Sequence, residues 1–223
     1  MNAPRFAVVF DLDGTLVDSR EDIVRATQFT LRQHGARELP AEVIASFVGD
    51  GARLLLARAF DVPETAPALD AHLATFLEYY TAHAADFTRP MPGALSALDA
   101  LREVPLALAT NKPRRTTDAV LRELGLAPRF RCIVAGGDLP QIKPDPVVLQ
   151  HVASELGVLP GALVMVGDGR QDIRAGKAVG AATVGVLGGF GTEEELVAAG
   201  ADVVLPSLHD VPRVVQELMQ QRG

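Results

Sequence analysis

Short runs of apolar residues recur along the chain in the pattern expected of buried β-strands. Each run is only three to five residues long and consists mainly of Val, Ile, Leu and Ala. A membrane-spanning helix needs about 20 consecutive apolar residues, so none of these runs fits a bilayer span. The runs that predict strands cover residues 6–10, 106–109, 132–135, 163–166, 183–186 and 203–205.

Helical periodicity fills most of the intervals between these runs. Apolar residues recur three and four positions apart within 94–101, 120–124 and 147–156. Strands that alternate with helices require crossover connections between parallel strands. The sequence therefore predicts an α/β fold, a doubly wound and mostly parallel Rossmann-like sheet with helices on both faces.

The alternation stops between residues 18 and 86, where only helical patterns occur. One of them places Leu69, Phe76 and Tyr80 on a single apolar face, which is typical of a packed helix. We expect an all-helical cap domain over 18–88, inserted into a core domain formed by 1–17 and 89–223. The proline-rich segment 89–93 then serves as the return linker.

Composition narrows the functional class. The 223 residues are 48% hydrophobic and carry a net charge of −7, which argues against a duplex nucleic-acid partner. Cys132 is the single cysteine, so no internal disulfide can form, and the first residues lack the charged segment of a signal peptide. We expect a cytoplasmic protein without a membrane segment.

Two aspartates follow the first predicted strand, at the position where parallel sheets bind ligands. Asp11 and Asp13 are two residues apart, so their side chains begin the next turn close together. Two such carboxylates repel each other unless a cation or a proton lies between them. Alone, the pair is equally compatible with a polar turn that bends at Gly14.

Polar side chains also follow three later strands. Taken singly, Thr110 and Asn111 fit a helix N-cap, Lys143 a surface loop, and Asp168 and Asp172 an acidic cap. All of them nevertheless fall at carboxyl ends of predicted parallel strands, which share one edge of the sheet. Carboxylates grouped there suit a hard cation such as Mg²⁺, and a lysine and a threonine suit a phosphate.

These segments resemble, in order and context, the motifs of the haloacid-dehalogenase superfamily of aspartate-nucleophile phosphohydrolases. The resemblance rests on 11–19, on Thr110, on Lys143 with the following proline, and on Asp168 with Asp172. Within the superfamily, segments 47–51, 110–113 and 136–138 make the chain most similar to the bacterial phosphoglycolate phosphatase group. Gly169 departs from the family pattern, in which serine is frequent.

The resemblance implies a role for each motif residue. Asp11 is expected to attack phosphorus, Asp13 to act as general acid and base, and Thr110 and Lys143 to hold the phosphoryl oxygens. Mg²⁺ is expected on the Asp11 side chain, the Asp13 backbone carbonyl and Asp168, with Asp172 acting through a metal-bound water. The implied reaction is hydrolysis of 2-phosphoglycolate through an aspartyl-phosphate.

Further substrate contacts are expected from both domains. The partner implied is a small phosphorylated metabolite, bound by a monomer or a homodimer. For Arg53, which could meet a substrate carboxylate, an exposed arginine on a cap helix with no role in binding is the simpler interpretation. The expected substrate-binding residues are Gly14, Thr15 and Asn111 in the core, and Asp50, Gly51 and Arg53 in the cap.

Several other functions share part of this pattern. A receiver-type signalling module also combines acidic residues, a threonine and a lysine, but it lacks a helical insert and the Asp11/Asp13 pair. A dehalogenase lacks the second aspartate, and a phosphonatase needs a cap lysine, whereas 18–86 contains none. A sugar-phosphate phosphatase or phosphomutase stays open, because only the cap distinguishes it.

The chain has just three lysines, at 112, 143 and 177, and otherwise uses arginine for positive charge. A lysine in so arginine-rich a chain suggests a need for a compact point charge, although three scattered lysines can equally have no special role.

Overall fold

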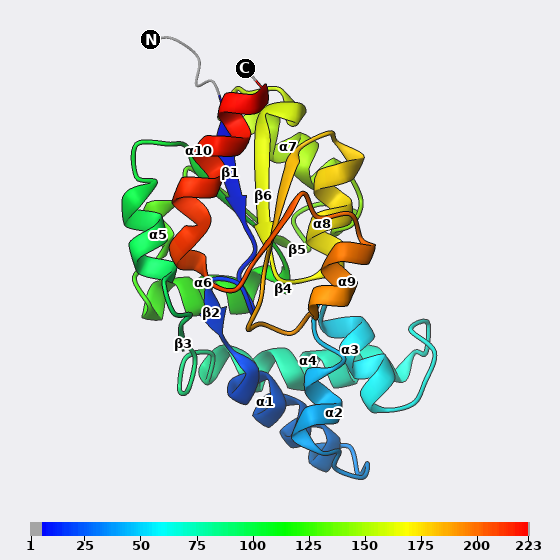
Figure 1. Ribbon diagram of the computed structural model, residues 1–223. Helices are drawn as coiled ribbons and strands as arrows, with labels where there is room; N and C mark the ends of the chain where they lie inside the picture. The colour runs from blue at the N-terminus through cyan, green and yellow to red at the C-terminus, as the bar shows by residue number, and fades with distance from the viewer. Residues whose placement is uncertain (1–5, 223) are drawn as a thin grey trace.

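A six-stranded parallel sheet lies at the centre of the computed structural model, which describes residues 6–222 (Figure 1). The spatial order of the strands is β5-β4-β1-β6-β7-β8. Each apolar run expected to be a strand belongs to this sheet, so the predicted doubly wound α/β fold is confirmed. The bounds are β1 Ala7–Phe10, β4 Leu106–Pro113, β5 Cys132–Gly136, β6 Leu163–Gly167, β7 Ala182–Val186 and β8 Val203–Leu205.

Helices cover both faces of the sheet because successive strand residues point to opposite sides. Val8 and Phe10 of β1 pack in the same cluster as residues of α5 (Ala94–Ala100), α6 (Arg114–Glu123) and α10 (Val211–Arg222). Ala7 and Val9 pack on the other face, against α7 (Val147–Leu156) and α8 (Arg170–Ala178). Figure 1 shows these two layers on either side of the sheet. The layers around the sheet also contain α9 (Glu193–Ala198) and 3₁₀ turns at Ala127–Arg129, Pro160–Ala162 and Leu208–Asp210.

Four helices form a separate layer beyond the carboxyl ends of the strands (Figure 1). They are α1 Arg20–Gln33, α2 Ala41–Ala45, α3 Ala52–Ala59 and α4 Ala68–Ala82, and we call them the cap. The rings of Phe29 and Tyr79 stack with centroids 4.2 Å apart and join α1 to α4. Buried cap residues such as Leu56 and Phe76 belong to the same apolar cluster as Phe10 and Leu12 of the core. The cap thus packs directly on the edge of the sheet that carries the polar motifs.

A two-strand ladder carries the chain into and out of the cap. β2 (Val17–Asp18) pairs antiparallel with β3 (Arg89–Pro90), where the sequence pattern indicated only a linker. Strands of two residues have no periodicity, so the pattern gave no sign of them. On the cap side of this ladder, the buried Asp22 carboxylate accepts hydrogen bonds from the backbone N–H groups of Phe87 and Thr88 and from the Thr88 hydroxyl, at 2.6–3.1 Å. The two connections to the cap are therefore fastened to each other.

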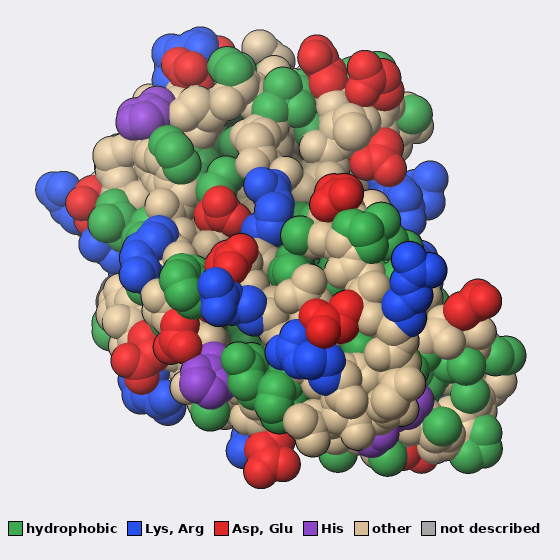
Figure 2. Space-filling view, turned by 90° about the horizontal axis from the view of Figure 1, so that it is seen from below, with side chains coloured by type: hydrophobic (Ala, Val, Ile, Leu, Met, Phe, Trp, Pro, Cys, Tyr) green, Lys and Arg blue, Asp and Glu red, His purple; other side chains and the backbone are tan. Residues whose placement is uncertain are grey.

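Acidic and basic side chains are interspersed over the surface seen from the cap end (Figure 2). Several of them form exposed pairs, among them Arg53 with Asp70 and Arg32 with Glu38. Such pairs contribute little to stability because water screens both charges. Within residues 6–222, no helix has the length and apolar character needed to cross a membrane.

Candidate active site

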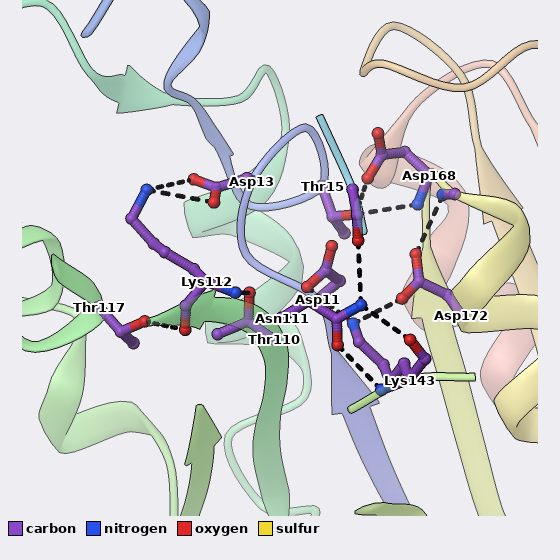
Figure 3. A network of polar contacts seen from close by, with 12 residues as sticks. Asp11, Asp13, Thr15, Thr110, Asn111, Lys112, Thr117, Lys143, Asp168 and Asp172 are labelled. Atoms are coloured by element: carbon purple, nitrogen blue, oxygen red, sulfur yellow. Dashed lines mark hydrogen bonds and ion pairs between the residues drawn. The ribbon is translucent and has the colours of Figure 1, made fainter. Parts of the chain in front are cut away.

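The polar motifs meet at the carboxyl edge of the sheet, beneath the cap (Figure 3). Asp11 follows β1, Thr110 lies within β4 and Asp168 follows β6, and these three strands are neighbours in the sheet. Lys143 reaches the same place from the loop between β5 and α7. The structure therefore brings together residues that are as much as 161 positions apart, Asp11 and Asp172 being the extremes.

Three buried carboxylates form the centre of the site. Oxygen atoms of Asp11, Asp168 and Asp172 all lie within 4.8 Å of one another. The Lys143 ammonium is 2.8 Å from Asp11 Oδ1 and 2.6 Å from Asp172 Oδ1, and its side chain is 1% exposed. A single buried ammonium therefore contacts two of the three acidic groups.

Hydrogen bonds fix the orientation of two of these carboxylates. Asp168 Oδ1 accepts from the Thr15 hydroxyl at 2.7 Å, and its Oδ2 accepts from the Phe190 N–H at 2.7 Å. The Gly169 N–H donates to Asp172 Oδ2 at 3.0 Å. Gly14 bends the chain here with φ +84°, and a Cβ on it would lie 2.2 Å from Asp168 Oδ2. Gly14 and Thr15, expected to contact substrate, thus contribute to the placement of Asp168.

Burial and mutual repulsion make the acidic cluster hard to ionise fully. Burial, with the nearby charge of Asp11, raises the pKa of Asp168 to about 6. Burial also raises the pKa of Asp172 to about 7 despite the opposing Lys143 ammonium, with Asp11 and Asp168 adding to the rise. Burial alone would lower the pKa of Lys143, but Asp11 and Asp172 outweigh it and raise that pKa. The cluster needs more positive charge than Lys143 supplies.

The residues present fit a hard divalent cation. Asp11 Oδ1 is fully buried and accepts no hydrogen bond of good geometry, although Lys143 lies beside it. This buried oxygen therefore has one ion-pair partner and keeps lone pairs for a second cation. Carboxylate oxygens converging from two strand ends are the ligands that Mg²⁺ and similar ions prefer. A divalent ion at this point would balance the excess negative charge.

Asp13 points away from this cluster and is held by a second lysine. Lys112 Nζ lies 2.9 and 3.1 Å from the two carboxylate oxygens of Asp13, and the Ser19 hydroxyl donates to Asp13 Oδ1 at 2.6 Å. Lys112 Nζ also contacts the hydroxyl of Tyr80, which comes from cap helix α4. Burial and the carboxylates of Asp13 and Asp22 raise the pKa of Tyr80, so its hydroxyl keeps its proton. The sequence patterns did not predict this contact; the scarcity of lysine was the one available sign.

Asn111 connects the lysine loop with the cap. Its side-chain amide donates to the backbone carbonyl oxygens of Lys143, at 2.9 Å, and Gly49, at 3.0 Å, and its carbonyl oxygen accepts from the Lys143 N–H at 2.9 Å. These bonds fix the backbone on which Lys143 is carried. Thr110 is buried next to them and accepts from the Lys112 N–H at 3.2 Å.

The expected cap contacts occupy different places. Gly51 lines the cavity between cap and core, whereas Asp50 is not part of its wall and accepts from Arg58 at 2.8 Å and Arg170 at 3.3 Å. Arg53 lies on the cap surface, where it donates to Asp70 at 2.7 Å and to the Glu64 carbonyl oxygen at 3.0 Å. The structure does not bring Arg53 to the carboxylate cluster, and Arg53 is absent from the cavity wall.

Comparison with known proteins places this architecture in a family. Residues 8–186 match the family described as haloacid dehalogenase-like hydrolase. The chain is 39% identical to a phosphoglycolate phosphatase of Neisseria meningitidis, in an alignment that covers 97% of this chain and 95% of the relative. The chain belongs to the haloacid dehalogenase-like hydrolase family. Its enzyme class is that of a phosphoric monoester hydrolase.

Other similar proteins share the fold and differ in their named substrates. An N-acetylmuramic acid 6-phosphate phosphatase of Pseudomonas aeruginosa is 33% identical, over 96% of this chain and 95% of the relative. The crystal structure of a predicted phosphoglycolate phosphatase from Haemophilus somnus superposes with a TM-score of 0.88 at 27% identity, covering 96% of this chain and all of that one. The similarity therefore extends through the helical cap.

Proposed function

We propose that this chain is a magnesium-dependent phosphatase that hydrolyses 2-phosphoglycolate to glycolate and phosphate through a phosphoryl group carried on Asp11. The observation that carries the proposal is the close group of three buried carboxylates, Asp11, Asp168 and Asp172, of which two pair with the single ammonium of Lys143. Such a site, with its excess of buried negative charge, suits a cation and a phosphate dianion bound together.

Electrostatics explains why positive charge must accompany the nucleophile. At about 4 Å and an effective dielectric constant near 20, a carboxylate repels each unit of phosphate charge by roughly 4 kcal/mol. A dianion therefore opposes the approach of Asp11 by roughly 8 kcal/mol, a large part of a typical enzymatic acceleration. Lys143 supplies one positive charge beside Asp11, and a bound Mg²⁺ would supply two more.

In the proposed mechanism, different residues around Asp11 transfer protons, hold the phosphate and hold the metal ion. Asp11 attacks phosphorus, and hydrolysis of the resulting aspartyl-phosphate completes the turnover. Asp13 gives a proton to the leaving oxygen in the first step and takes one from water in the second. Thr110 and Lys143 hold the phosphoryl oxygens, while Asp11, the Asp13 carbonyl and Asp168 would hold Mg²⁺, with Asp172 acting through water.

The cavity beneath the cap favours a small substrate. Its free volume is about 50 Å³, bounded by Asp11 and Asp13 on the core side and by Leu55 and Phe76 on the cap side. At about 10–15 Å³ for each water-sized site, that is room for about four non-hydrogen atoms. The glycolate part of 2-phosphoglycolate has this size, which supports the proposed substrate.

A panel of phosphate monoesters tests this proposal. We expect the highest kcat/KM for 2-phosphoglycolate, with lower values for hexose phosphates, and loss of phosphate release when EDTA is added to the Mg²⁺-containing assay. Steady transfer of phosphate between sugar hydroxyls would indicate a mutase instead. Full activity in EDTA, after extensive dialysis, would contradict the metal assignment.

The pKa shifts predict how stability of the metal-free protein depends on pH. Because the pKa values of Asp168 and Asp172 rise on folding to about 6 and about 7, ionising them opposes folding. The stabilisation that these two carboxyl groups give in their protonated form is therefore complete below about pH 4. It is lost as pH rises through about 6 to 7.

Thermal melts in EDTA and in millimolar Mg²⁺ measure this effect without any activity assay. We expect Mg²⁺ to raise Tm by several degrees near pH 8, where the carboxylates are ionised, and by much less near pH 5. The variant Asp168→Asn removes one ligand and should abolish most of the gain. An equal gain at both pH values would show that the cation binds elsewhere.

A further inference from the structure

Lys112 is a buried ammonium for which the proposed chemistry has no use. Its side chain is 2% exposed, and its Nζ lies between Asp13, at 2.9 Å, and the Tyr80 hydroxyl, 4.2 Å from the centre of the Tyr80 ring. Removing a lysine from water costs several kcal/mol, and a buried ion pair often fails to repay that cost. Stability alone is therefore a weak reason for a lysine here.

The other two lysines differ from it. Lys143 contacts the nucleophile Asp11, and Lys177 pairs with Asp202 on the surface with its side chain 40% exposed. Figure 3 shows the Lys112 side chain extending toward Asp13 on one side of Asp11, with Lys143 on the other side. If the phosphate binds beside Asp11 and Lys143, the side of Asp11 that faces Lys112 is open to the rest of the substrate.

The cavity on that side is mostly apolar. Ile23, Leu55 and Phe76 form the cap side of its wall, and Lys112 is the only cationic side chain in the described lining. A mostly apolar cavity with one ammonium favours a ligand with one anionic group, because only such a ligand can take the place of a carboxylate beside that ammonium. In the structure, the carboxylate of Asp13 occupies the position facing that ammonium.

We propose that Lys112 is the residue that makes this enzyme specific for phosphorylated carboxylic acids, by binding the carboxylate of the substrate. The Tyr80 hydroxyl supplies the second donor from the cap, so the closed cap completes the binding site. The substrate carboxylate replaces Asp13 as the partner of Lys112, and the Asp13 side chain then turns to the leaving oxygen. This inference rests on the proposed function, since it assigns the recognition of the non-phosphate end of the same substrate.

The test compares two substrates that differ only at this end. In 2-hydroxyethyl phosphate, the carboxylate of 2-phosphoglycolate is replaced by a neutral hydroxymethyl group. We define the preference as kcat/KM for 2-phosphoglycolate divided by kcat/KM for 2-hydroxyethyl phosphate. In Lys112→Met, we expect this preference to fall about 10- to 100-fold, chiefly through a higher KM for 2-phosphoglycolate.

Matched variants separate recognition from folding. Lys177→Met makes the same change at a surface lysine and should keep the parent preference. Tyr80→Phe keeps the ring and removes one donor, so we expect the preference to fall about three- to tenfold. If Lys112→Met does not fold, the preference measured for Tyr80→Phe tests the inference in its place. A structural role for Lys112 would lower kcat/KM for both substrates equally and leave the preference unchanged, which would overturn the inference.

The parent enzyme distinguishes failure of this inference from failure of the proposed function. If the parent shows no preference for 2-phosphoglycolate over 2-hydroxyethyl phosphate, the proposed substrate class is wrong. If the parent has the preference and both Lys112→Met and Tyr80→Phe retain it, the substrate class stands and the assignment of Lys112 is wrong.

Discussion

Replacing Asp11 with asparagine should reduce phosphate release by at least about 10⁴-fold, the order expected when a covalent nucleophile is lost. The amide is nearly isosteric with the carboxylate, but it is not nucleophilic and supplies no charge to a cation. The substitution also removes one of three crowded acidic groups, so we expect the fold to persist. Steady-state kinetics with 2-phosphoglycolate and a thermal melt in EDTA measure the two effects.

Asp99→Asn is the control for this variant. Asp99 lies on α5 and pairs with Arg129 at the surface, with its side chain 63% exposed. The same chemical change there should leave both turnover and Tm close to those of the parent. Substantial turnover by Asp11→Asn, with no trace of the parent protein in the sample, would contradict the covalent mechanism.

Replacing Asp13 with asparagine should lower kcat for 2-phosphoglycolate by about 10²- to 10⁴-fold, the usual contribution of a general acid or base. The loss should depend on the leaving group. An alkoxide such as glycolate needs a proton as it departs, whereas p-nitrophenolate departs without one. With p-nitrophenyl phosphate, we therefore expect the first step to survive and the second, which needs a base, to remain slow.

This difference predicts a burst in Asp13→Asn. Rapid mixing with p-nitrophenyl phosphate should release about one p-nitrophenolate per active site before slow turnover begins. Asp118→Asn, a change to an exposed carboxylate on α6, should show the parent time course. Equal slowing of both steps with p-nitrophenyl phosphate would argue that Asp13 orients the site without transferring a proton.

The central sheet and its polar edge were predictable because their signals are local. The central strands are runs of apolar residues buried on both faces, and such runs remain visible in a single sequence. In a parallel sheet the carboxyl ends of the strands lie at the same edge, so the residues that directly follow the strands come together there. Asp11, Lys143 and Asp168 were therefore predicted as a group, and the structure brings them together.

Other features depend on contacts between distant residues, which a sequence pattern does not reveal. Tyr80 fits an apolar helix face, and nothing in that pattern indicates that its hydroxyl meets Lys112. Thr15 was expected to contact substrate, but its hydroxyl bonds Asp168 across 153 positions. Arg53 lies near the cap motif in sequence, yet the helix that carries it turns its side chain toward Asp70.

The most direct test of the account is to find where the phosphoryl group resides during turnover. Asp13→Asn, mixed with p-nitrophenyl phosphate and Mg²⁺ and quenched in acid during the burst, can be digested at low pH and its peptides analysed by tandem mass spectrometry. We predict one added phosphoryl group on the peptide that contains Asp11, with the fragments placing it on that residue. A phosphoryl group on another side chain, or a burst without any phosphorylated peptide, would contradict the assignment of Asp11 as the nucleophile.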